Sequence, residues 1–272
     1  LVANSDVNGI TFTGSYEVGM SILRDYAAGG AFVRPLVAEM GGKNAAIVSR
    51  TADVETAALG VMRSAFGATG QKCSACSRVY VHRDVKAAFT ERLVELTKQI
   101  KVGDPTLHEN YIGPLVNEAA YRAYQKYVDH AAADGEILVG GQTLDESGYY
   151  VAPTVVQKLP FDHYLWKEEL FVPLVVVGEY EHREEAMRMA NDASLGLTAG
   201  FFSEDDAEVQ WFLDNIEAGC VYVNRAAGAT TGAWPGYQAF GGWKGSTGTN
   251  KSSMSHYYLQ QYMREQSQTI LR

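Results

Sequence analysis

Short apolar runs rich in β-branched residues alternate with helix-periodic runs along most of this 272-residue chain. We expect strands at residues 10–12, 79–81, 137–139, 151–156, 174–177, 200–202 and 220–224. We expect helices over residues 18–26, 54–66, 85–100, 118–134, 183–193 and 205–216. Such alternation is typical of a twisted sheet with helices packed on its faces. The predicted fold class is therefore α/β.

Charge and cysteine content narrow the class of protein. A formal net charge of -9 and a pI near 5.2 argue against a nucleic-acid or anionic-membrane partner, because both require clustered Lys and Arg. The longest apolar stretch, Leu170–Gly178, is too short to cross a bilayer. Three cysteines do not make a disulfide framework. We therefore expect a reducing compartment, the cytoplasm, and no membrane partner.

The first residues, Leu1-Val2-Ala3-Asn4, lack an initiator Met and run directly into a strand-like segment. No basic region followed by an apolar core precedes that strand, so a secretory leader is not indicated. We expect the chain to be a fragment of a longer protein.

A thiol, Cys73, follows a helix-periodic run that the glycines at 67 and 70 interrupt. A buried helix would place this thiol rigidly beside a cleft, and Lys72, Arg78 and backbone N–H groups would favour its thiolate. Cys73 is on this basis a candidate nucleophile. The alternative is that Cys73 is a small buried residue, as most free cysteines are.

The string around this thiol resembles the catalytic-cysteine motif of the aldehyde dehydrogenase superfamily, Gly-Gln-x-Cys-x-Ala followed by Arg. The matching residues are Gly70, Gln71, Cys73, Ala75 and Arg78. The form found here, Gly-Gln-Lys-Cys-Ser-Ala-Cys-Ser-Arg, is similar to the branch that oxidises glutamate γ-semialdehyde. The resemblance implies that Cys73 is the catalytic nucleophile.

A second candidate catalytic residue is Glu39, which lies next to a Gly-Gly turn between apolar segments. A partly buried carboxylate there is a plausible general base with a raised pKa, although it could equally be a solvated loop residue. The segment Glu39-Met40-Gly41-Gly42-Lys43 resembles the superfamily's Glu-Leu-Gly-Gly-Lys motif. This resemblance implies that Glu39 activates the water that hydrolyses the acyl-enzyme.

Three residues are candidates for holding a cofactor. A strand that leads through Gly14-Ser15 into a helix N-terminus suits a phosphate, and its resemblance to Phe-Thr-Gly-Ser-x-x-Val-Gly places Ser15 against the pyrophosphate of NAD. The segment Glu168-Glu169-Leu170-Phe171-Val172-Pro173 resembles Glu-Glu-Ile-Phe-Gly-Pro, which implies that Glu169 bonds the nicotinamide ribose and that Phe171 packs near the ring. Val172 replaces a glycine of that motif, so we expect altered backbone there.

Candidate substrate-binding residues lie in and near residues 228–242, a segment rich in Gly, Ala and Thr that we expect to form a loop. It resembles the substrate-anchoring loop of the semialdehyde branch. The resemblance implies that backbone N–H groups of Gly232 and Ala233 hold the substrate's α-carboxylate and that Phe240 lines the aldehyde channel. Ser74, beside the thiol, joins them as a substrate-binding residue.

The resemblance covers nearly the whole chain and implies its organisation. Residues 1–38 would be the end of a Rossmann-like NAD domain, 39–227 the catalytic domain, and 228–272 the substrate-anchoring loop and an oligomerisation tail. Residues 256–263 alternate polar and aromatic side chains, which predicts a C-terminal strand that pairs with another chain or with a missing part of this one. The resemblance implies that this strand takes part in forming a homo-oligomer. The family's first dinucleotide-binding strands and its oxyanion Asn lie outside this sequence, so we expect the chain alone to show no NAD-dependent oxidation.

The reaction implied is oxidation of glutamate γ-semialdehyde to glutamate, with NAD as cofactor and a thiohemiacetal and a thioester on Cys73. Two alternatives stay open, another aldehyde substrate and a folded but non-catalytic fragment. Cys73 and Cys76 also form a C-x-x-C motif, which occurs in redox dithiols and in zinc sites. Zinc needs about four ligands, however, and the His residues of this chain show no ligand spacing. We therefore expect no metal.

Overall fold

The computed structural model describes residues 1–29, 33–145, 147–226, 238–249, 251 and 253–272. Its largest element is a seven-stranded sheet, in which all neighbours are parallel except the antiparallel edge pair β5–β8. In spatial order the strands are β12 (Cys220–Val223), β11 (Thr198–Phe202), β3 (Asn44–Val48), β4 (Cys76–His82), β9 (Leu174–Tyr180), β8 (Thr154–Gln157) and β5 (Glu136–Val139). The predicted α/β class is confirmed.

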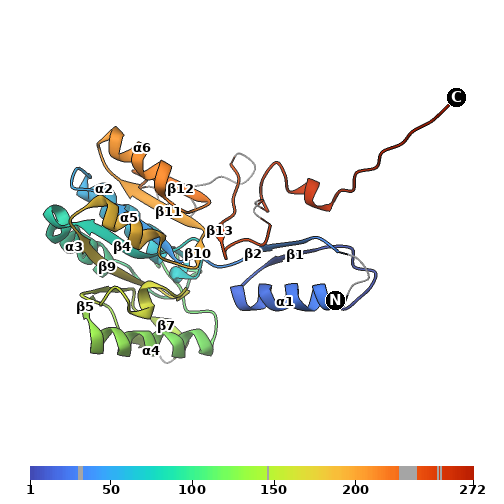
Figure 1. Cartoon of the computed structure of the whole chain (residues 1–272). Helices are drawn as coiled ribbons and strands as arrows, with labels where there is room; N and C mark the ends of the chain where they lie inside the picture. Colours follow the sequence, from blue (N-terminus) through green and yellow to red (C-terminus); the bar gives the residue numbers. More distant parts are fainter. Residues whose placement is uncertain (30–32, 146, 227–237, 250, 252) are drawn as a thin grey trace.

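Helices cover both faces of this sheet (Figure 1). Two of them, α2 (Val54–Phe66) and α3 (Arg83–Lys98), pack their apolar stripes on one face. On the other face lie α4 (Glu118–Asp134), α5 (Arg183–Asn191) and α6 (Asp206–Asn215). Each fully buried Leu or Phe in these clusters contributes about 1.5–3 kcal/mol of transfer free energy. The helix predictions are confirmed to within a few residues at each end.

The helices begin where the sequence supplies capping side chains. Asp53 accepts a hydrogen bond from the Thr56 N–H at the start of α2. Asn117 accepts one from the Ala120 N–H at the start of α4. Such caps each contribute about 1 kcal/mol, so these two boundaries follow directly from residue type.

A second, two-stranded parallel sheet stands beside the large one, to the right in Figure 1. It pairs β1 (Ile10–Thr13) with β2 (Leu36–Glu39), and α1 (Tyr16–Ala28) lies against it. The chain passes from β2 into β3 through residues 40–43. This passage lies close to the predicted boundary at residue 38, and the three-part domain division stays a prediction.

The predicted strand over 151–156 is in fact two strands. β7 (Tyr150–Val151) pairs with β6 (Thr143–Asp145), and β8 begins only at Thr154. Pro153 has no N–H to donate to a strand ladder, which accounts for the break between them. A further short pair joins β10 (Leu195–Gly196) to β13 (Trp243–Lys244).

The predicted C-terminal strand over residues 256–263 is wrong. This segment contains a short 3-10 helix, η3 (Leu259–Tyr262), and the chain then runs on without regular structure. A strand needs a neighbour to satisfy its backbone groups, whereas here the hydroxyl groups of Tyr258 and Tyr262 hydrogen bond Thr11 on β1. The alternating tyrosines therefore contact β1 through side chains and form no ladder.

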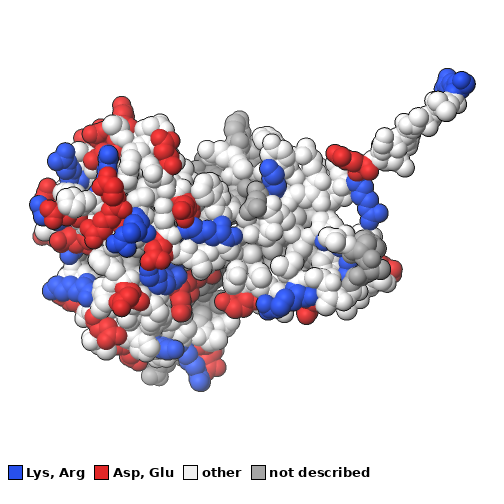
Figure 2. Space-filling view, viewed as in Figure 1, with Lys and Arg blue, Asp and Glu red and all other residues white. Residues whose placement is uncertain are grey.

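On the face seen in Figure 2, acidic and basic side chains are interspersed, with no large patch of one sign. Within the described residues, no helix is both long enough and apolar enough to span a membrane.

Candidate active site

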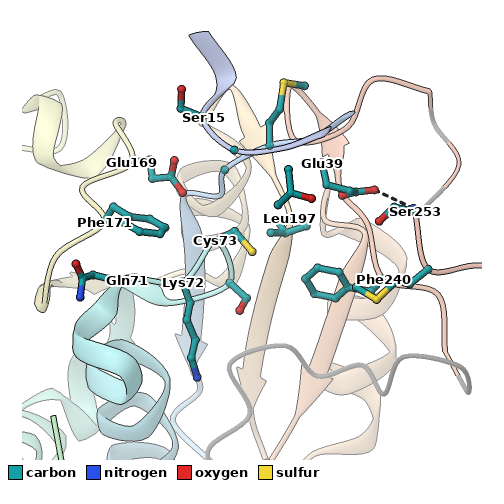
Figure 3. Close-up of a pocket in the computed structure, with 16 residues that line it drawn as sticks. Ser15, Glu39, Gln71, Lys72, Cys73, Glu169, Phe171, Leu197, Phe240 and Ser253 are labelled. Carbon is teal, nitrogen blue, oxygen red and sulfur yellow. Dashed lines mark hydrogen bonds between the residues drawn. The ribbon is translucent and has the colours of Figure 1, made fainter. Parts of the chain in front are cut away.

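The candidate site is a cavity of about 810 Å³ between the two sheets (Figure 3). The carboxyl ends of β1 and β2 reach it from one side, and the amino ends of β3, β4, β9 and β11 reach it from the other. All predicted site residues that the structure describes line it: Ser15, Glu39, Cys73, Ser74, Glu169, Phe171 and Phe240. Gly232 and Ala233 lie outside the described residues.

Cys73 lies on the turn between a 3-10 helix, η1 (Gly67–Gly70), and β4. This turn is fixed by Asn44, the first residue of β3, whose Nδ2 donates to Cys73 O at 2.8 Å and to Ala75 O at 2.9 Å. The Asn44 Oδ1 accepts from Thr198 N at 2.9 Å, so one buried amide joins three segments of the chain. Sequence reasoning gave Asn44 no role, since a lone Asn has no distinctive spacing.

Glycine is required at positions 41 and 42 because other parts of the chain pass too close to leave room for a side chain. A Cβ at Gly42 would lie 2.3 Å from Cys73 O, and a Cβ at Gly41 would lie 1.9 Å from Glu169 Oε2. In the absence of these side chains, Gly42 N donates to Glu169 Oε1 at 2.9 Å. The turn after Glu39 therefore fixes the positions of both the thiol segment and the Glu169 carboxylate.

The prediction that Lys72 and Arg78 favour a Cys73 thiolate is wrong. Lys72 extends away from the thiol in Figure 3. The Arg78 guanidinium is buried elsewhere, where it donates to the backbone oxygens of Lys43, Met189 and Ala190. Burial, followed by the nearby Glu169 carboxylate, raises the pKa of Cys73 above its usual value. A raised pKa favours the thiol form of Cys73 at neutral pH.

We expect Glu169→Gln to speed alkylation of Cys73 by iodoacetamide about threefold at pH 8, because it removes a charge that opposes thiolate formation. The raised pKa also predicts that the wild-type rate still rises between pH 7 and pH 9. Glu168→Gln is the matched control, since Glu168 is exposed and does not line the cavity. Equal rates in wild type and Glu169→Gln would contradict this electrostatic coupling.

The other two thiols are buried in strands. Burial raises the pKa of Cys76, in β4, to about 12. Cys220 begins β12, beside Phe240, and its Sγ donates to Ala239 O and Gly241 O. Of the three, only Cys73 lines the cavity and is partly exposed. Among the described residues, no group of three or more His, Cys, Asp or Glu side chains is placed to hold a metal ion.

Glu39 ends β2, and its side chain is 6% exposed. Its Oε1 accepts a hydrogen bond from Ser253 N at 3.0 Å, and in Figure 3 the carboxylate points towards Ser253. Burial raises the pKa of Glu39, as expected from the sequence, although hydrogen bonds from Ser253 and Thr247 oppose this effect. A carboxylate with a raised pKa beside a thiol is suited to accept a proton from water.

The amino end of α1 faces the same cavity. Ser15 caps the helix, with its Oγ accepting from Val18 N at 3.3 Å, and a helix N-terminus favours a phosphate group. Phe171 lies opposite with its side chain 43% exposed and a φ of 56°. The unusual backbone therefore falls at Phe171, one residue before the expected Val172. The amino end of α1, the Glu169 carboxylate and the Phe171 ring therefore line the same cavity.

Ser74 and Phe240 lie on the remaining wall, and Leu197 lies beside Cys73 in Figure 3. Ser74 is buried, and its carbonyl accepts from the Thr198 hydroxyl at 3.3 Å. Sequence reasoning did not find Leu197, Ser253 or Met254, which also line the cavity. They sit on segments whose sequences carry no local signature of a site.

A partly exposed thiol, a buried carboxylate and a helix N-terminus that suits a phosphate thus line one cavity. A sequence model of the aldehyde dehydrogenase family matches residues 1–268. The chain belongs to this family.

Among its relatives, the 1-pyrroline-5-carboxylate dehydrogenase of Geobacillus sp. (strain WCH70) is 36% identical over 253 residues, which are 92% of this chain and 48% of that protein. The enzyme of the same name from Bacillus subtilis (strain 168) is 34% identical over 262 residues, 95% of this chain and 50% of that protein. The chain thus spans about half the length of the curated relatives it matches.

Solved structures of aldehyde dehydrogenases also resemble this chain. A Thermus 1-pyrroline-5-carboxylate dehydrogenase with bound NAD superposes with a TM-score of 0.90 at 35% identity, covering 96% of this chain and 50% of that one. A betaine aldehyde dehydrogenase from Staphylococcus aureus in complex with NAD+ gives a TM-score of 0.88 at 28% identity, covering 96% of this chain and 51% of that one. The predicted fold, an aldehyde-dehydrogenase-like α/β domain, is confirmed.

Proposed function

We propose that this chain carries the catalytic residues of an NAD-dependent aldehyde dehydrogenase that oxidises glutamate γ-semialdehyde to glutamate. The observation that carries the proposal is that Cys73, Glu39 and the amino end of α1 line one cavity. The names of the relatives supply the substrate class, since several are 1-pyrroline-5-carboxylate dehydrogenases.

Cys73 is the nucleophile in this proposal. Its thiolate attacks the aldehyde carbon, and the resulting thiohemiacetal is then oxidised to a thioester. NAD, when bound, supplies the hydride acceptor. Ser15 and the α1 N–H groups suit its pyrophosphate, while Glu169 and Phe171 suit its ribose and ring.

Glu39 completes the cycle by taking a proton from the water that attacks the thioester. Its raised pKa suits this role, because a base with a pKa closer to the working pH accepts a proton more readily. Cys73 then leaves as a thiolate, and the acid product is released.

An uncharged aldehyde is the second candidate substrate. Much of the described cavity wall is apolar and comes from Met40, Phe171, Leu197, Phe240 and Met254. Such a wall suits the carbon chain of either substrate, so the choice depends on whether a carboxylate is also bound. The proposed carboxylate-binding residues, Gly232 and Ala233, lie outside the described residues.

In the full-length enzyme, we expect glutamate γ-semialdehyde to exceed hexanal by about 100-fold or more in kcat/KM, because hexanal would leave carboxylate-binding N–H groups unpaired. Steady-state NADH formation with each aldehyde measures this ratio. Gly232→Val should crowd the carboxylate and remove most of the preference while Cys73 alkylation stays intact. Equal efficiency with both aldehydes would refute the substrate assignment and leave the dehydrogenase assignment standing.

A further inference from the structure

Two buried polar side chains contact the turn that carries Cys73. Asn44 begins β3 and Thr198 begins β11, the neighbouring parallel strand of the large sheet. They are 2% and 3% exposed, and the Asn44 Oδ1 accepts a hydrogen bond from Thr198 N at 2.9 Å. The two residues therefore form one hydrogen-bonded unit at the amino ends of adjacent strands.

This unit donates to three successive carbonyl groups of the turn. The Asn44 Nδ2 donates to Cys73 O at 2.8 Å and to Ala75 O at 2.9 Å. Between them, the Thr198 hydroxyl donates to Ser74 O at 3.3 Å. The turn also closes on itself, with Ala75 N donating to the carbonyl of residue 72 at 3.1 Å. Each carbonyl from residue 73 to residue 75 is thus held by a side chain of the sheet.

The direction of these carbonyls also determines the direction of the N–H groups in the same peptide units. A trans peptide unit is planar, and its C=O and N–H groups point in opposite directions. Because Asn44 holds Cys73 O, the Ser74 N–H of that peptide unit points away from Asn44. Cys73 and Ser74 line the cavity, whereas Asn44 and Thr198 do not. The Ser74 N–H therefore faces the side of the turn on which the thiol lies.

The surroundings of the thiol make these N–H groups important. Burial raises the pKa of Cys73 and the carboxylates of Glu169 and Glu39 add to this effect, whereas the N–H groups of Cys73 and Ser74 oppose it. The Cys220 thiol lies in the small apolar cluster against which Cys73 packs. Hydrogen bonds to the charged form of a group favour that form, so backbone N–H groups are the local donors that can stabilise a thiolate here.

We propose that Asn44 and Thr198 are positioning residues that hold the turn over residues 72–75 with the Ser74 N–H directed at the Cys73 sulfur. The proposal rests on the proposed function, in which Cys73 is the nucleophile. Asn44 and Thr198 act only through the backbone of the turn, since neither side chain lines the cavity.

Alkylation of Cys73 by iodoacetamide, measured on the whole chain by peptide mass from pH 7 to pH 10, tests this role. Asn44→Ala removes the donor to two carbonyls, and Thr198→Val removes the hydroxyl while keeping the shape of the side chain. Thr198→Ser does the reverse, because it keeps the hydroxyl and loses the methyl group. A hydrogen-bonding role is therefore lost in the Val variant and retained in the Ser variant.

Two matched controls remove similar hydrogen bonds elsewhere. Thr97→Val removes a buried hydroxyl that donates to Leu93 O at 2.7 Å within α3. Asn191→Ala removes an amide that donates to Asn215 O at 2.9 Å and accepts from Glu217 N at 2.9 Å. Neither Thr97 nor Asn191 lines the cavity.

We expect alkylation of Cys73 at pH 8 to be about tenfold slower in Asn44→Ala and about threefold slower in Thr198→Val, because a thiolate that loses a hydrogen-bond donor has a higher pKa. These differences should narrow towards pH 10, as the thiolate forms in every variant. Thr198→Ser and both controls should stay within about twofold of wild type. A turn that was only loosened would instead expose the thiol, lower its pKa and speed its alkylation.

Rates in Asn44→Ala and Thr198→Val that equal or exceed the wild-type rate, with Cys73 still the first thiol to react, would overturn the positioning role alone. Earlier labelling of Cys76 or Cys220 in the wild type would overturn the proposed function and this inference with it. If Asn44→Ala does not fold, the Thr198 pair decides: a slow Val variant beside a normal Ser variant supports the role, and equal rates in the two overturn it.

Discussion

Glu39→Gln is expected to slow hydrolysis of the Cys73 acyl-enzyme by about 1,000-fold while leaving its formation within about threefold of wild type, because general-base catalysis typically contributes 10²–10⁴-fold. Glutamine has nearly the same shape, and its Oε1 can still accept the hydrogen bond from Ser253 N. The change therefore removes the proton acceptor with little change in packing.

The decay of the acetyl-enzyme, followed by mass after a pulse of p-nitrophenyl acetate, measures this effect. Glu168→Gln is the control for charge, since Glu168 is exposed and does not line the cavity. Decay of the Glu39→Gln acyl-enzyme at the wild-type rate would exclude Glu39 as the base.

Cys73→Ala should reduce NADH formation by the full-length enzyme by about four orders of magnitude or more, because loss of a covalent nucleophile removes the whole pathway through the thioester. Cys76→Ala should stay within a few-fold of wild type. Cys76 lies in β4 with 2% of its surface exposed, so its substitution tests the thiol without altering the cavity wall. Substantial oxidation by Cys73→Ala, or its loss in Cys76→Ala alone, would contradict the assignment.

The secondary structure was largely predictable because apolar periodicity and helix caps are local signals. The α4 boundary followed from Asn117 and Gly135, and α2 followed from its apolar spacing. The cluster of site residues was also foreseeable from motifs, since Ser15, Glu39, Cys73 and Glu169 line one cavity. Their catalytic roles stay predictions that the experiments above test.

The electrostatics of the thiol could not be read from neighbours in the sequence. Arg78 is five residues after Cys73, but it lies in β4 and its guanidinium bonds the carbonyls of Met189 and Ala190 at the end of α5. Burial and Glu169, which is 96 positions further along the chain, instead raise the pKa of Cys73. Only the folded chain determines which charges lie near a group.

Two further features depended on tertiary contacts. The alternating residues 256–263 fit a strand pattern, but no strand of the described chain pairs with them, and Tyr258 and Tyr262 bond Thr11 instead. Asn44 fixes the Cys73 turn through hydrogen bonds to segments far along the chain. Neither contact has a local sequence signature.

Mapping of the first thiol to react tests the central claim, that Cys73 is the nucleophile of this site, most directly. The whole chain would be treated with limiting iodoacetamide at pH 8 and digested with trypsin. Because the peptide Cys73–Arg78 contains two cysteines, fragmentation of that peptide is needed to locate the label. We predict carbamidomethylation of Cys73 before Cys76 and Cys220, since only Cys73 lines the cavity. Earlier labelling of Cys76 or Cys220 would contradict the account.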